Sequence, residues 1–154
     1  MAFDPHKVAE HISSWLNSYA DASKFDGFVL GVSGGIDSAV TATLCLMTGK
    51  PVYVIDLPIH QDPTELERSK ELCDSFSKRF SNVTVLRVPL TDVYEATKAA
   101  LPDSVDLSQG LALANTRARL RMTFLYAIGA QRRALVVGTG NKIEDFGIGF
   151  FTKY

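Results

Sequence analysis

The chain has 154 residues, 46% of them hydrophobic and 21% charged, and we expect residues 1–154 to form a single globular domain with an apolar core. Its formal net charge of −1 at pH 7 argues against a nucleic-acid-binding surface, and no apolar run is long enough to span a membrane. The first residues do not resemble a secretory signal, and we therefore expect a cytoplasmic protein.

The first part of the chain predicts a helix, a strand and a second helix. Apolar residues recur at steps of three and four over 5–20, which predicts an amphipathic helix. The apolar run 27–32 predicts a buried strand, and 36–47 predicts the helix that follows it. Gly49 is a plausible C-terminal cap for that second helix.

The middle of the chain continues the alternation. The run 52–57 predicts a second buried strand, and a loop separates it from a helix over 64–80. Thr64 and Glu67 have the spacing of a capping box, which predicts that this helix begins at Thr64. The segment 83–88 predicts a third strand.

The last third of the chain predicts a short helix over about 91–100 and a long helix to about residue 131. The long helix is expected to begin at Asp106 or Ser108. The run 134–138 predicts a fourth strand, and 138–149 predicts a glycine-rich loop.

The alternation of strands and helices, without hairpin signals, predicts an α/β fold. Its sheet is expected to be parallel, with helices on both faces in a Rossmann-like, three-layer arrangement. Ligands of such sheets bind beyond the C-terminal ends of the strands. The loops 33–38 and 138–144 both follow such ends, so we expect them to meet in one crevice. Two cysteines without metal-ligand spacing, Cys45 and Cys73, are expected to be buried thiols in a reducing compartment.

A glycine- and serine-rich turn joins the first strand to the second helix and predicts a phosphate-binding loop. It consists of Gly31, Val32, Ser33, Gly34, Gly35, Ile36, Asp37 and Ser38. Glycines allow a ligand to approach the backbone, and free N–H groups at the helix start attract an anion. The carboxylate of Asp37 fits such a site if Mg²⁺ lies between it and the phosphates. The alternative is an ordinary turn whose Asp37 favours the helix dipole. The Walker and dinucleotide-binding glycine patterns are both absent.

The long helix carries a second candidate group. Helical spacing places Arg117 and Arg121 on one face and Arg119 on roughly the opposite side, in a stripe with Asn115 and Tyr126. A guanidinium among polar and aromatic groups is suited to bind phosphate or carboxylate. Arg119 is therefore a candidate ligand, and a solvated basic stripe is the alternative.

The loop after the fourth strand carries the third candidate group. Glu144 would supply a second oxygen ligand for Mg²⁺ opposite Asp37, or it is an ordinary surface residue. Thr139 lies where the strand is expected to end, and it could contact a nucleotide.

The segment Ser33-Gly-Gly-Ile-Asp-Ser38 resembles the signature of the ATP pyrophosphatase (PP-loop) superfamily. Together with Asn115-Thr-Arg-Ala-Arg-Leu-Arg-Met122, Gly138-Thr-Gly-Asn-Lys-Ile-Glu144 and Gly149-Phe-Phe-Thr-Lys-Tyr154, it resembles NAD⁺ synthetase in order and spacing. The resemblance implies an adenine nucleotide alpha hydrolase-like fold. It also implies ATP-dependent amidation of deamido-NAD (nicotinic acid adenine dinucleotide), in which ammonia displaces AMP from an adenylylated carboxylate.

The resemblance also implies residue roles and partners. The whole phosphate loop and Thr139 would bind ATP, Asp37 and Glu144 would hold Mg²⁺ and serve catalysis, and Arg119 and Lys153 would bind deamido-NAD. It implies a homodimer and, because no glutaminase domain precedes this part, use of free ammonia. Relatives continue beyond the Phe-Phe-Thr-Lys-Tyr segment, so we expect a C-terminal part to be missing here.

Two other functions are kept as alternatives. One is another PP-loop ligase, such as a GMP synthetase-like amidase or a thiolating enzyme. Thiolation usually needs cysteines on loops, and both cysteines fall in predicted helices. The other alternative is an ATP-binding fragment without turnover.

Overall fold

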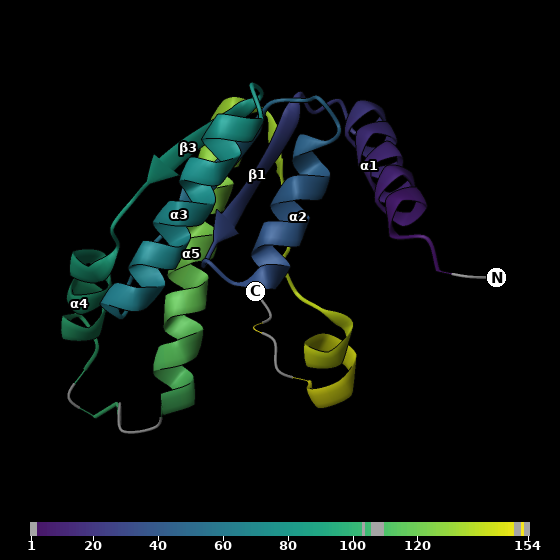
Figure 1. Ribbon diagram of the computed structural model, residues 1–154. Coiled ribbons are helices and arrows are strands. Elements are labelled where there is room, and N and C mark those ends of the chain that lie inside the picture. Colours follow the sequence, from purple (N-terminus) through teal and green to yellow (C-terminus); the bar gives the residue numbers. More distant parts are fainter. Residues whose placement is uncertain (1–2, 103, 106–109, 150–151, 153–154) are drawn as a thin grey trace.

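A computed structural model describes residues 3–102, 104–105, 110–149 and 152 (Figure 1). The elements are, in chain order, α1 (Pro5–Ala22), β1 (Gly27–Val32), α2 (Ile36–Leu46), β2 (Val52–Asp56), α3 (Pro63–Arg79), β3 (Val83–Arg87), α4 (Thr91–Ala99), α5 (Gly110–Arg132), β4 (Ala134–Val136) and the π-helical turn η1 (Ile143–Ile148). Within this part of the chain the strands form one four-stranded sheet in the order β3-β2-β1-β4.

All strand pairs of this sheet are parallel, as the sequence predicts. Val29 of β1 lies beside Tyr53 of β2 on one side and beside Val136 of β4 on the other. Val54 of β2 pairs with Val85 of β3. The C-terminal ends of β1, β2 and β4 therefore lie at the same edge of the sheet. β4 ends at Val136, two residues earlier than predicted.

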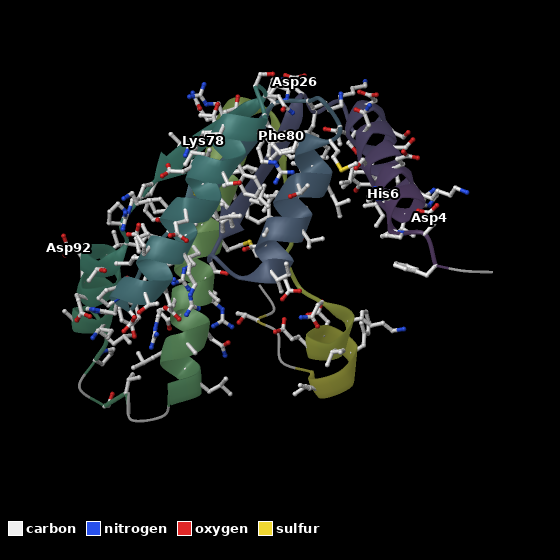
Figure 2. All side chains as sticks on the ribbon, viewed as in Figure 1. Asp4, His6, Asp26, Lys78, Phe80 and Asp92 are labelled. Atoms are coloured by element: carbon white, nitrogen blue, oxygen red, sulfur yellow. The ribbon has the colours of Figure 1, made fainter. Side chains whose placement is uncertain are left out.

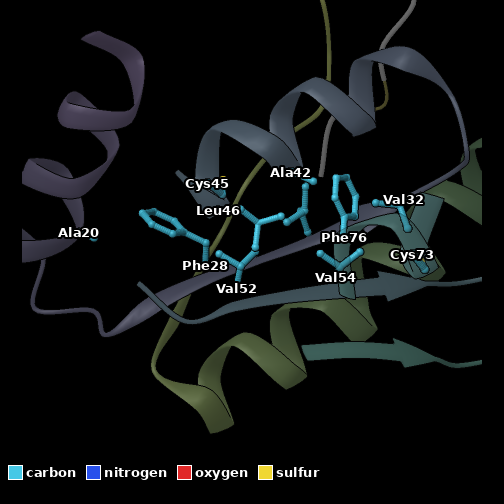
Figure 3. Close-up of a cluster of buried hydrophobic side chains, with 11 residues drawn as sticks. Ala20, Phe28, Val32, Ala42, Cys45, Leu46, Val52, Val54, Cys73 and Phe76 are labelled. Carbon is cyan, nitrogen blue, oxygen red and sulfur yellow. The ribbon is translucent and has the colours of Figure 1, made fainter. Parts of the chain in front are cut away.

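One face of the sheet is covered by α2 and α3, and α1 packs against α2 (Figures 1 and 3). The even-numbered residues Phe28, Leu30 and Val32 of β1 belong to this core, as expected for side chains that alternate across a strand. Cys45 of α2 and Cys73 of α3 lie in the same cluster as free thiols, which confirms that both are buried. Burial raises the pKa of Cys45 to about 12 and that of Cys73 to about 11.

The opposite face is covered by α4 and α5. Val29 of β1 and Ile55 of β2 form the centre of this second core, together with Leu125 of α5. α5 lies close against the sheet at Gly129, where a Cβ atom would lie 2.9 Å from the Ala134 carbonyl oxygen. The absence of a side chain at Gly129 lets the helix rest directly on β1 and β4.

Aspartates, rather than the predicted threonine, begin two of the helices. Asp4 Oδ1 accepts a hydrogen bond from the His6 amide at 3.1 Å at the start of α1 (Figure 2). Asp62 Oδ1 accepts one from the Thr64 amide at 2.8 Å at the start of α3. The predicted capping box at Thr64 is wrong, because Pro63 already occupies the first helical position and Asp62 is the cap.

The end of the chain differs from the prediction in a second place. The expected loop over 138–149 contains η1, which Asn141 begins by accepting hydrogen bonds from the Ile143 and Glu144 amides, both at 3.0 Å. Gly149, with a φ of 73°, ends it in the left-handed conformation. The predicted start of α5 at Asp106 or Ser108 lies outside the described residues. Within the described residues, no helix has the length and apolarity needed to cross a membrane.

Candidate functional site

A cavity of about 490 Å³ opens at the C-terminal edge of the sheet. Its walls come from segments that are far apart in the sequence. One wall is the turn after β1, another is the residues following β2, a third is α5, and the last is the end of β4. The two loops that were expected to converge do so, because Ser33 and Ser38 line the same cavity as Gly138 and Thr139.

The turn after β1 is shaped by a glycine that no other residue could replace without strain. Gly34 has a φ of 80°, in the left-handed region that disfavours side chains. A Cβ atom there would lie 2.8 Å from the Ser69 amide nitrogen and 3.0 Å from the Arg68 Cβ. The loop is thus seated against the backbone of α3, so Gly34 serves the packing of the loop as well as any ligand.

The serine hydroxyls of this turn form a small network that fixes its shape. The Ser38 hydroxyl donates to the Gly35 carbonyl oxygen at 2.9 Å and accepts from the Ser33 amide at 3.3 Å. The Gly35 amide in turn donates to the Ser33 hydroxyl at 3.3 Å. Ser38 is buried and Ser33 is exposed, so the outer hydroxyl faces the solvent side of the turn.

The start of α2 has the properties of an anion-binding site. Gly35 occupies the N-cap position, and no side chain caps the helix there, in contrast to Asp4 at α1 and Asp62 at α3. The first amides of a helix lack intrahelical partners and carry the positive end of its dipole. Ile36 at the first helical position is 73% exposed, so this end of α2 is open to a ligand.

Asn141 contacts the carboxylate of Asp37 and the backbone of Glu144, the two residues predicted to bind a metal. Its side-chain amide donates to Asp37 Oδ2 at 3.4 Å, while its Oδ1 accepts from the Glu144 amide. In Figure 1 the yellow segment that carries η1 lies next to the start of α2. Asp37 and Glu144 are both exposed. Among the described residues no three His, Cys, Asp or Glu side chains gather as a metal site. A pair of carboxylates fits Mg²⁺, which takes its remaining ligands from phosphates and water.

The arginines of α5 are arranged differently from the candidate stripe. Arg121 lines the cavity, half-buried, and its Nε donates to the Leu57 carbonyl oxygen at 3.0 Å. Arg119 is exposed and is not among the cavity-lining residues, and Lys153 lies outside the described residues. Desolvation by burial, followed by the nearby Arg117, lowers the pKa of Arg121.

A signal for the position of Arg121 was present in the sequence. Arg117, Arg121, Leu125 and Gly129 follow one another at steps of four, and residues at this spacing lie on one helix face. Leu125 and Gly129 are buried against the sheet, so this face continues from the core into the cavity. Gln61, from the loop after β2, also lines the cavity and was not among the predicted site residues.

Two polar residues near the cavity have structural partners. Asp56, at the end of β2, is buried, accepts a hydrogen bond from the Ser69 hydroxyl at 3.0 Å and pairs with Arg87 Nε at 3.4 Å. His60, with a φ of 47°, directs its ring to the carboxylate of Glu95 on α4. Both interactions hold the β2–α3 segment in place beside the cavity.

The structure is that of an α/β protein with a parallel sheet, and a glycine- and serine-rich turn after its first strand lines a cavity at the C-terminal edge of that sheet. The sequence profile described as "NAD synthase" matches residues 8–154, and the chain belongs to this family. It is 32% identical over 146 residues to an NH(3)-dependent NAD(+) synthetase of Mesoplasma florum, with 94% of this chain and 57% of that protein covered. It is 34% identical to one from Saccharolobus solfataricus, with 100% of this chain and 53% of that protein covered.

Solved structures agree with this assignment and confirm the predicted fold class. An NMN synthetase from Francisella tularensis superposes with a TM-score of 0.88 at 33% identity, over 99% of this chain and 60% of that one. An NH3-dependent NAD synthetase from Campylobacter jejuni gives a TM-score of 0.84 at 31% identity, over 98% of this chain and 62% of that one. The chain thus spans little more than half the length of the relatives that it matches.

Proposed function

We propose that this chain binds ATP and converts deamido-NAD to NAD⁺ with ammonia, releasing AMP and pyrophosphate, as a single domain of NAD synthetase type. The observation that carries the proposal is the cavity whose wall is a phosphate loop followed by an uncapped helix start. Several relatives of the family are NH(3)-dependent NAD(+) synthetases, which supports the choice of reaction.

ATP would be held mainly by the backbone of the phosphate loop. Gly31 and Val32 belong to the cavity wall, and the amides at the start of α2, from Ile36 to Ser38, would face the phosphates. Thr139, at the opposite wall, would contact the nucleotide from the end of β4. The apolar side chains of α5 that line the cavity suit the adenosine part.

Asp37 and Glu144 would hold Mg²⁺ at the edge of this site. When bound, the ion neutralises charge on the phosphates and so helps pyrophosphate to leave. Asn141 would tie the segment that carries Glu144 to the start of α2, because its side chain bonds the Asp37 carboxylate and the Glu144 backbone amide. These roles make Asp37 and Glu144 the catalytic residues of the proposal.

The reaction requires positioning more than a side-chain nucleophile. A carboxylate oxygen of deamido-NAD attacks the α-phosphorus of ATP, the bond to pyrophosphate breaks, and an acyl adenylate forms. Ammonia then attacks the acyl carbon, AMP leaves with the bonding electrons, and the nitrogen loses one proton to solvent, which leaves the amide. The phosphate-loop amides would stabilise the charge that develops in the first step. Cys45 and Cys73 are buried and take no part.

Deamido-NAD would be bound by Arg119 and Lys153. Arg119 is exposed on α5 and is not among the residues that line the cavity, so the substrate would reach it from the solvent. We further propose a homodimer that works in the cytoplasm with free ammonia, without nucleic acid or membrane as partners. A GMP synthetase-like or thiolating enzyme is not favoured, because the relatives are NAD synthetases.

A second product deserves a direct test. The Francisella tularensis protein with a TM-score of 0.88 is named NMN synthetase. The same chemistry, applied to a mononucleotide with a nicotinate carboxylate, would give NMN in place of NAD⁺.

The proposal is tested by incubating the chain with ATP, Mg²⁺, ammonium and either dinucleotide or mononucleotide acceptor, and by separating products chromatographically. We expect NAD⁺ and AMP in equal amounts from deamido-NAD, and loss of both with Asp37→Asn. If NMN forms with a higher kcat/KM than NAD⁺, the proposed substrate becomes the mononucleotide and no longer deamido-NAD. ATP binding without AMP release would establish the binding-only alternative and overturn the proposed activity.

A further inference from the structure

Arg121 is the one cation among the described residues that line the cavity. Its Nε is fixed by the Leu57 carbonyl oxygen at 3.0 Å, so the guanidinium is held at the end of β2. The two terminal nitrogens have no hydrogen-bond partner among the described residues. A guanidinium offers five N–H donors in a planar fork, and the terminal ones remain for a ligand.

The charges around Arg121 leave it without a counter-ion. None of the described ion pairs includes it. Asp56 of β2 and Glu65 of α3 are the acidic groups that act on it, and Asp56 is already engaged by Ser69 and Arg87. Arg117, one turn away on α5, adds a like charge. A half-buried cation in this setting is poorly solvated and gains from an anionic partner.

We propose that Arg121 binds a phosphate group of the nucleotide that occupies the cavity. The inference rests on the proposed function, since it assumes that ATP enters this cavity. It adds a side-chain contact from α5 to the backbone contacts of the phosphate loop, and the two contacts would grip the nucleotide from opposite walls. A fork fixed at Nε presents its terminal donors in a set direction, which suits a phosphate oxygen pair.

The neighbouring arginines of α5 are not placed to make this contact. Arg119 is exposed and is not among the residues that line the cavity. Arg117 stacks over the Tyr94 ring at 5.5 Å, outside the cavity. Of the arginines in the Asn115–Met122 segment, Arg121 is the one that lines the cavity.

The experiment compares the binding of adenosine, AMP and ATP to the wild-type chain, Arg121→Gln and Arg121→Lys by calorimetry. Arg132→Gln is the control, because Arg132 lies on the same helix but outside the cavity, stacked over Tyr53 at 5.4 Å. We expect Arg121→Gln to weaken AMP and ATP binding by about tenfold to a hundredfold, the loss typical of a charged hydrogen bond, and to leave adenosine unchanged. Arg121→Lys should lose less, since it keeps the charge but not the fork.

Each other outcome overturns the inference. An equal loss of adenosine affinity would show that Arg121 contacts the nucleoside or only holds the Leu57 carbonyl in place. Unchanged AMP affinity would show that Arg121 does not bind the phosphate. If Arg121→Gln does not fold, as judged by thermal melting, the adenosine and AMP affinities of Arg121→Lys decide in the same way. A wild-type chain that binds none of the three nucleotides would overturn the proposed function as well, which distinguishes the two failures.

Discussion

At the scale of single residues, Gly34 shows how closely the phosphate loop depends on α3. Its φ of 80° and the 2.8 Å distance from a Cβ atom to the Ser69 amide nitrogen both disfavour a side chain at this position. We expect Gly34→Ala to lower the free energy of unfolding by about 2 to 4 kcal/mol, from left-handed strain and overpacking together. Urea denaturation measures this change.

The neighbouring glycine is a matched control for this prediction. Gly35 has a φ of −83°, and a Cβ atom there would meet only the Ser33 hydroxyl, at 3.3 Å. Gly35→Ala should therefore change the free energy of unfolding by less than about 1 kcal/mol. Equal losses of unfolding free energy for the two variants would contradict the role given to the close packing of Gly34 against α3.

The buried thiols predict a loss of stability at alkaline pH. Cys45 and Cys73 have pKa values raised from 9.0 to about 12 and about 11, chiefly by burial. Between pH 9 and the raised values, the unfolded chain releases thiol protons that the folded chain retains. The free energy of unfolding should therefore fall as pH rises through this window. Denaturation curves at pH 8 and pH 10 measure the fall, and a double Cys→Ala variant with the same fall would contradict this origin.

At the scale of elements, α3 begins at a titratable cap. The Thr64 hydrogen bonds lower the pKa of Asp62, so its stabilising effect is present above the ordinary carboxylate pKa and is lost as pH falls through the lowered value. We expect Asp62→Ala to lower the melting temperature at pH 7. Asp62→Asn, which can still cap, should lower it less and should make the melting temperature less dependent on pH. Melting curves between pH 2 and pH 7 test this, and a wild-type pH profile in Asp62→Asn would contradict it.

The elements differ in how far the sequence predicts them. The strands were located well, because buried apolar runs between turn residues are a local signal, as in 27–32 and 83–88. The side of α5 that faces the cavity is harder to predict, because the helix carries apolar residues on several faces. Packing against the sheet decides which of these faces is buried. η1 was missed because a single side chain, Asn141, organises a segment whose composition is that of a loop.

At the scale of the molecule, the site exists only where α2, α5 and the ends of three strands meet. The local motif after β1 can be recognised from the sequence alone. The spacing of Arg121, Leu125 and Gly129 places them on one helix face, but the fold decides that this face lines the cavity. The proposed metal site joins α2 to η1 in the same way and supports a last prediction. ATP should raise the melting temperature when Mg²⁺ is present. A ligand that binds only the folded chain stabilises it, by about 2.7 kcal/mol at 100 times its dissociation constant. Asp37→Asn or Glu144→Gln should reduce the difference between Mg²⁺ and EDTA in a thermal-shift assay. Glu71→Gln, an exposed carboxylate on α3, should leave that difference unchanged. Equal shifts in EDTA would show that ATP binds without the ion.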